Sequence, residues 1–232
     1  MLSKQEALSL LYEWVKSESL RKHCLSVATA MEGYAKKYVE EGRIKGMDIG
    51  GVVGDGSKSN TSEFNGISHK GGEDLDGDDN YKQEIIDKWY ICGLLHDFDY
   101  EKYPDINVHP KEGCKFLEKN GYPTEIIQAI LGHNAKTGVK RESLMAKTLF
   151  AVDELSGLIV ALAHVRPGKF SDMSAKSVMK AIKKKDFAAA INRDDINKGI
   201  EELGLNSEEK RNEHFETVIR VLEGIKKELG FH

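Results

Sequence analysis

Residues 143–165 read SLMAKTLFAVDELSGLIVALAHV. Ser143 is a residue type that favours a helix N-cap, apolar residues follow at helical spacing, and Pro167 ends the pattern. The stretch therefore predicts a long buried helix. Asp153 lies in its middle, and a buried carboxylate is unfavourable unless it is paired or bound to a metal. No basic residue of this helix has the spacing to pair with Asp153, so metal binding explains the carboxylate best.

The segments on either side also have the periodicity of helices. Ser3 and Glu6 form a capping-box pattern before the first apolar repeat. His23 shares a helical face with Val27 in the next repeat. No stretch alternates polar and apolar residues as a half-buried strand would. We therefore expect an all-α fold, with helices near 4–15, 19–41, 84–97, 110–120, 123–133, 143–165, 174–190, 193–203 and 207–229.

Residues 41–83 interrupt this helical pattern. About a quarter of these positions are glycine, most of the others are polar, and the end is acidic. Such a segment cannot bury enough apolar surface to offset its chain entropy, so we expect a flexible insertion that acts either as a lid or not at all. It would interrupt a helical domain of residues 1–165, followed by a C-terminal helical extension, residues 166–232, packed on the same core.

The composition is that of an ordinary globular protein. The 232 residues carry a net charge of -4, which gives no reason to expect a polynucleotide partner. Cys24, Cys92 and Cys114 are far apart and form no CxxC pattern, as expected of reduced thiols. The N-terminus has no signal-peptide pattern, and the longest apolar run, residues 155–165, is too short to span a bilayer. These features predict a cytoplasmic protein without a membrane partner.

Five further residues are candidate metal ligands beside Asp153. A histidine suits the C-terminal end of a helix, as His96 does, but the carboxylate of Asp97 has the wrong sign there. His23, His96, Asp97 and Asp153 alone would make a mononuclear site. His109 and His133 would add a second ion, with Asp97 offering an oxygen to each. Each also has a plain structural interpretation, His109 as a residue before a helix that starts at Pro110 and His133 as a surface residue.

Four stretches resemble one known family, the HD-domain metal-dependent phosphohydrolase superfamily in its six-ligand form. They are LLHDFDYEKYP (94–104), HPKEG (109–113), AILGHNAKTG (129–138) and FAVDELSGLIVALAHVRPGK (150–169). The resemblance covers residues 17–165 and implies an HD-type helical bundle. It implies one metal on His23, His96, Asp97 and Asp153, and a second on Asp97, His109 and His133.

The resemblance implies a phosphohydrolase that acts on a nucleotide or another small phosphate ester through a metal-activated water, with Asp97 as the catalytic residue. It implies two divalent ions, iron or manganese first, with Zn, Ni, Co or Mg also open. We take Lys136, Arg166 and Lys169 as candidate phosphate contacts, although ordinary surface charge is the competing interpretation. Two other functions stay open: a di-iron oxygenase with the same six ligands, and a non-catalytic metal-binding sensor.

Overall fold

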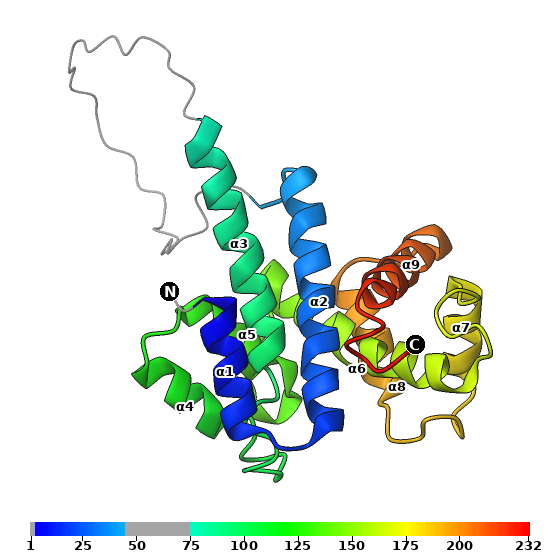
Figure 1. Cartoon of the computed structure of the whole chain (residues 1–232), viewed down its shortest axis with the longest axis horizontal. Helices are drawn as coiled ribbons and strands as arrows, with labels where there is room; N and C mark the ends of the chain where they lie inside the picture. The colour runs from blue at the N-terminus through cyan, green and yellow to red at the C-terminus, as the bar shows by residue number, and fades with distance from the viewer. Residues whose placement is uncertain (1–2, 45–74) are drawn as a thin grey trace.

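The computed structural model describes residues 3–44 and 75–232. Within these ranges the protein is all-α, as predicted: the structure has nine α-helices, one short 3-10 helix and no strand (Figure 1). The helices are α1 (Lys4–Trp14), α2 (Glu18–Glu40), α3 (Leu75–Leu95), α4 (Lys111–Lys119), α5 (Thr124–His133), α6 (Leu144–Val165), α7 (Ala175–Lys183), α8 (Arg193–Glu202) and α9 (Glu208–Gly224); the 3-10 helix is η1 (Ala135–Thr137).

Local signals set the start of several helices. Ser3 and Glu6 form the predicted capping box, in which each side chain bonds the backbone of the other residue. The hydroxyl groups of Ser17 and Ser143 accept hydrogen bonds from the first turns of α2 and α6. The predicted helix over 143–165 is thereby confirmed, and most of its side chains are buried.

α6 is the central helix of the bundle. It contacts α2, α5, α8 and α9, while α2 packs along α3. Figure 1 shows α1, α4 and α5 on one side of α6 and the C-terminal helices α7 and α9 on the other. The buried apolar side chains of α7, α8 and α9 join those of the first six helices in one core. The three cysteines are buried free thiols within that core, as expected of reduced residues.

Three predicted boundaries are wrong. α3 begins at Leu75 rather than near residue 84. Most of the insertion expected over residues 41–83, namely residues 45–74, lies outside the described part. A helix whose later turns are buried, as α3 is from Ile85 onward, can extend through a polar segment that would not form a helix alone. α7 ends at Lys183 rather than near residue 190, because the side chains that follow are exposed or half-buried and add little burial. α9 ends at Gly224 rather than near residue 229, because glycine weakens a helix.

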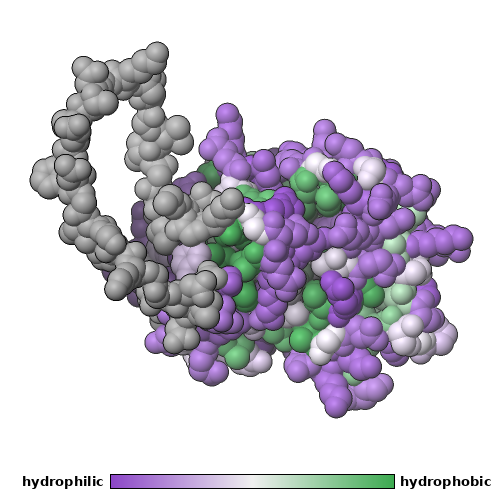
Figure 2. Space-filling view, turned by 90° about the horizontal axis from the view of Figure 1, so that it is seen from above, coloured by the Kyte–Doolittle hydropathy of each residue, from purple (hydrophilic) through white to green (hydrophobic). Residues whose placement is uncertain are grey.

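The outer surface is mostly hydrophilic on the face that Figure 2 shows, with smaller apolar areas between charged side chains. In the described part of the chain, α6 is long and apolar enough to cross a membrane by length and composition. However, 61% of its most apolar window is buried within the protein. The core helix of a globular bundle has these properties, and α6 holds that position here.

Candidate metal centre

The fold brings all six predicted ligands together, from five segments far apart in the sequence. They form two groups, and within each group the potential ligand atoms lie within 4.8 Å of one another. The first group comes from α2, the residue directly after α3, and α6. The second comes from the turn after α3, the loop before α4 and the end of α5. The first group is His23, His96 and Asp153, and the second is Asp97, His109 and His133.

Asp97 lies between the two groups and faces both. Its Oδ1 atom is 3.1 Å from Nε2 of His109 and 3.3 Å from Nε2 of His133. Its Oδ2 atom is 3.4 Å from Nε2 of His96 and 3.6 Å from Nε2 of His23. One carboxylate therefore presents a separate oxygen to each group, as the two-ion hypothesis requires.

Asp153 is the carboxylate of the first group. Its Oδ1 atom lies 3.0 Å from Nε2 of His23 and 3.4 Å from Nε2 of His96. The carboxylate in the middle of the apolar helix α6 thus points at two imidazoles and at no lysine or arginine among the described residues. The interpretation of Asp153 as a ligand candidate agrees with this geometry.

Three of the candidate histidines are oriented so that Nδ1 is hydrogen-bonded and Nε2 is available for a cation. Nδ1 of His96 donates to the backbone oxygen of Gly93 at 2.7 Å, and Nδ1 of His133 donates to that of Ile130 at 2.5 Å. Since Nδ1 carries the proton in each ring, the neutral ring has its lone pair on Nε2. His109 is oriented in the same way by a carboxylate, that of Asp99.

The Nε2 atoms of the candidate ligands face one another at short range. Nε2 of His23 and Nε2 of His96 are 3.2 Å apart, and Nε2 of His109 and Nε2 of His133 are 3.1 Å apart. Two lone pairs at this separation repel unless a proton or a cation lies with them. Ligand atoms about 2.1 Å from a common ion are separated by roughly 3 Å, so both spacings fit a bound transition metal. Imidazole and carboxylate together are suitable for iron, manganese, zinc, nickel and cobalt.

The electrostatics of the group reflect the same close packing. Burial alone would lower the pKa of His96, but Asp97 and Asp153 raise it well above its usual value. Burial would likewise lower the pKa of His109, and hydrogen bonds to Asp97 and Asp99 raise it to about 9. Burial would raise the pKa values of Asp97 and Asp153, whereas the neighbouring imidazoles hold both below their usual range. The carboxylates therefore stabilise positive charge at this position.

A cavity of about 480 Å³ opens onto five of the six side chains, whereas His96 is fully buried and does not line it. Lys136, predicted as a phosphate contact, is part of its wall. Sequence reasoning missed two carboxylates there, those of Glu154 and Asp195. Burial is the main cause that raises the pKa of Glu154 to about 7, and the negative charge of the neighbouring Asp153 is the second cause. The position of Glu154 in an apolar helix was a signal that could have found it, whereas Asp195 reaches the cavity only through the packing of α8 on α6.

The other two predicted phosphate contacts do not line this cavity. Nε of Arg166 donates to the Asp172 carboxylate at 2.9 Å, and its Nη2 donates to the Asp172 backbone oxygen. Lys169 lies in the same turn with φ of 56°. The turn after α6 therefore engages its arginine locally, and the roles of Arg166 and Lys169 as substrate contacts stay predictions that the geometry does not favour.

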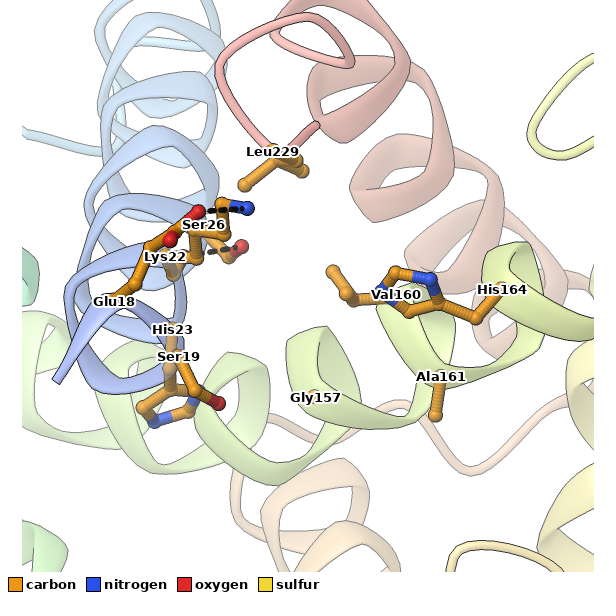
Figure 3. A pocket seen from close by; sticks show the side chains of 10 residues that line it. All are labelled: Glu18, Ser19, Lys22, His23, Ser26, Gly157, Val160, Ala161, His164 and Leu229. Atoms are coloured by element: carbon orange, nitrogen blue, oxygen red, sulfur yellow. Dashed lines mark hydrogen bonds and ion pairs between the residues drawn. The ribbon is translucent and has the colours of Figure 1, made fainter. Parts of the chain in front are cut away.

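A second cavity, of about 590 Å³, adjoins His23 between α2, α6 and the C-terminal tail (Figure 3). Of the six candidate ligands, only His23 lines it. The lysine among its lining residues, Lys22, is paired with Glu18 at 2.6 Å, and Leu229 lines the cavity from the tail. This cavity is therefore less suited to a charged substrate than the one above the two groups.

The class of protein that this fold and site define is an all-α protein with paired histidine–aspartate groups that could hold metal ions. Comparison with protein families agrees: the HD domain model matches residues 20–158, a range that includes all six candidate ligands, and the chain belongs to the HD domain family. The predicted resemblance is thereby confirmed. Comparisons with curated proteins and with solved structures gave no match.

Proposed function

We propose that this protein is a metal-dependent phosphohydrolase that acts on a small phosphate ester, such as a nucleotide, through a metal-activated water at a dinuclear site. The proposal is supported chiefly by Asp97, whose two oxygens face two separate ligand groups. A bridging carboxylate between two imidazole-rich groups suits a dinuclear centre with iron or manganese. Membership of a family composed mostly of hydrolases supports it by analogy.

Some residues of the chain would bind the metal ions, and others would orient the substrate. Two bound ions would supply positive charge for the phosphoryl oxygens and lower the pKa of a water. Asp97 would set the spacing of the two positions and is our candidate catalytic residue. Lys136, exposed at the cavity wall, would attract and orient a phosphate that enters. Glu154 and Asp195 could accept hydrogen bonds from hydroxyl groups on the remainder of the substrate.

The direct test combines metal analysis with a substrate panel. Protein loaded with iron or manganese should release phosphate from one or more nucleotides, sugar phosphates or other phosphomonoesters. Asp153→Ala should lose metal and activity together, because it removes a proposed ligand of the first group. The matched control is Asp186→Ala, an exposed aspartate on a turn, which should retain both. An Asp153→Ala variant that keeps a full complement of metal would contradict the ligand assignment.

One observation keeps a di-iron oxygenase as a second candidate. Among the described residues that line the cavity, Lys136 is the one lysine or arginine, while Glu154 and Asp195 add two carboxylates beyond the candidate ligands. This wall suits a hydroxyl-rich substrate better than a highly charged phosphate. Iron-loaded protein that consumes dioxygen and releases no phosphate from any panel member would favour this function. A protein that binds metal and does neither would favour the sensor.

The expected partners and location belong to the same proposal. A net charge of -4 and a mostly hydrophilic visible face support a small-molecule substrate rather than a polynucleotide or a membrane. We propose a cytoplasmic location on the composition of the sequence. Fractionation of cells that express the chain, with separate membrane and supernatant pools, would test this placement.

A further inference from the structure

Asp99 is a buried carboxylate that binds two partners and no candidate metal position. Its side chain is fully shielded from solvent. Oδ1 accepts a hydrogen bond from Nδ1 of His109 at 2.6 Å, and Oδ2 accepts one from the backbone N–H of Gly113 at 2.7 Å. A buried carboxylate with short bonds from both sides is a strong orienting group. Asp99 thus connects a candidate ligand to the start of α4.

The start of α4 is adapted to receive this carboxylate. Pro110, at the N-cap position, makes no side-chain capping bond, so the N–H groups of the first turn need another acceptor. Asp99 supplies it, and its negative charge suits the N-terminus of a helix. Gly113 permits the approach: a Cβ at this position would lie 2.8 Å from Cγ of Asp99 and 2.7 Å from the Phe98 ring. The carboxylate, the glycine and the helix start form one fitted unit.

His109 needs such a partner because no helix precedes it to supply a backbone oxygen. His96 and His133 each donate Nδ1–H to a backbone oxygen three residues earlier, in the last turns of α3 and α5. His109 lies in the loop between α3 and α4, where its ring nitrogen Nδ1 bonds a carboxylate instead of a carbonyl. Asn134 fixes the backbone of this loop through His109 O at 2.6 Å, but Asp99 is the residue that bonds the ring at Nδ1.

The two metal positions also differ in charge. The first would draw on His23, His96, Asp153 and one oxygen of Asp97, and the second on His109, His133 and the other oxygen. Among the described residues, the second position has one carboxylate, shared with the first, and no carboxylate of its own. A carboxylate that accepts the outer N–H of a ligand histidine makes that histidine a stronger donor to a metal. Asp99 would therefore supply the second position with negative charge through the His109 ring.

We propose that Asp99 is a positioning residue for the second metal position. Asp99 holds the His109 ring with Nε2 toward Asp97 and His133. Binding of a metal at this position thereby depends on a carboxylate that is not itself a ligand. The inference rests on the proposed dinuclear centre. It predicts a selective defect: loss of Asp99 weakens the second position and leaves the first, whose imidazoles do not contact Asp99.

The test is Asp99→Asn, measured by metal binding rather than by turnover. The amide keeps the shape, but its single oxygen cannot accept from both His109 and Gly113, which Asp99 bonds with separate oxygens. With Mn(II), wild-type protein should bind two ions and give the EPR signal of a coupled pair. The variant should bind the second ion about 10- to 100-fold more weakly and give the signal of an isolated ion. Asp186→Asn, an exposed aspartate, is the matched control and should behave as wild type.

The outcomes separate this inference from the proposed function. Wild-type protein that binds at most one ion would reject the dinuclear centre itself. Wild-type protein with two ions and an Asp99→Asn variant with unchanged affinities, or with both ions equally weakened in a folded protein, would overturn the role of Asp99. If the variant does not fold, ¹⁵N NMR of the wild-type imidazoles, assigned with His109→Gln, decides the question. Above pH 9, where the His109 ring is neutral, it should carry its proton on Nδ1, and a proton on Nε2 of the neutral ring would overturn the proposal.

Discussion

Replacing Gly93 with alanine should open the helix crossing that carries two of the proposed ligands. A Cβ on Gly93 would lie 2.8 Å from Cα of Ala28 and 2.8 Å from the backbone oxygen of Val27. Ordinary contact begins at 3.4 Å, so α2 and α3 would have to separate by about 0.6 Å (3.4 − 2.8). Both obstructing atoms belong to the backbone of α2, so no side-chain rotation relieves the overlap.

The expected loss has a part in stability and a part in metal binding. Overpacking of this kind destabilises a core by about 2 kcal/mol, which lowers Tm by roughly 4–8 °C in a chain of this size. His23 lies on α2 and His96 directly follows α3, and the Gly93 backbone oxygen orients the His96 ring. Metal sites need their ligands placed to about 0.5 Å, so we expect affinity at the first position to fall by about tenfold or more.

Two other glycines provide the controls. Gly33→Ala overlaps Cγ1 of Val221 at 2.7 Å, where α9 packs on α2. α9 carries none of the six candidate ligands, and Gly33 lies about 15 Å from His23 along α2. A Cβ on Gly224, at the end of α9, would meet no described atom within 4 Å, so its alanine variant should be neutral or slightly more stable. Thermal unfolding of metal-free protein and Mn(II) titration should show lower stability and weaker metal binding for Gly93→Ala, but only lower stability for Gly33→Ala. Wild-type metal affinity in a destabilised Gly93→Ala variant would refute the reasoning.

Two further predictions concern the buried histidine of α9 and the candidate phosphate contacts. Burial lowers the pKa of His214 to about 4 from a usual 6.5, so its stabilising contribution is complete above 6.5 and is lost as pH falls toward 4. Between pH 7 and pH 5 this removes about 2 kcal/mol, and denaturant unfolding of His214→Gln should show a correspondingly flatter pH profile than wild type. Lys136→Ala should raise KM for a phosphate ester, while Arg166→Ala, which breaks a pair with Asp172, should leave KM unchanged; the reverse ranking would restore Arg166 as a substrate contact.

The sequence was sufficient to predict the helical fold because its signals are local. The hydroxyl groups of Ser3, Ser17 and Ser143 cap the helices that follow them, and apolar periodicity continues from each cap. Asp153 could be recognised as a ligand candidate because its neighbours along α6 are apolar. These properties belong to single segments and do not depend on what packs against them.

The parts that were missed depend on contacts between distant segments. The first turns of α3 are polar, and only the buried later turns explain why the helix extends back to Leu75. Asp195 borders the metal-facing cavity because α8 packs on α6, a contact that no local pattern encodes. From the sequence, Arg166 resembles an unpaired cation close to the site. In the structure its guanidinium group pairs with Asp172, six residues later, and does not face the cavity. Charge in the sequence identifies candidates, whereas tertiary pairing decides which of them face the cavity.

The two proposed metal positions therefore differ in how they are built. His23, His96 and Asp153 lie on or directly after long helices whose packing holds them. The second position depends on His109, in a loop whose backbone is held by Asn134 and whose ring is held by Asp99 from the start of the same loop. Loops open at lower free energy than packed helices, so the second position should be the first to lose its metal when the protein is strained or diluted. A hydrolase that needs both ions would then be limited by this loop, and Asp99 would be as important to activity as a direct ligand.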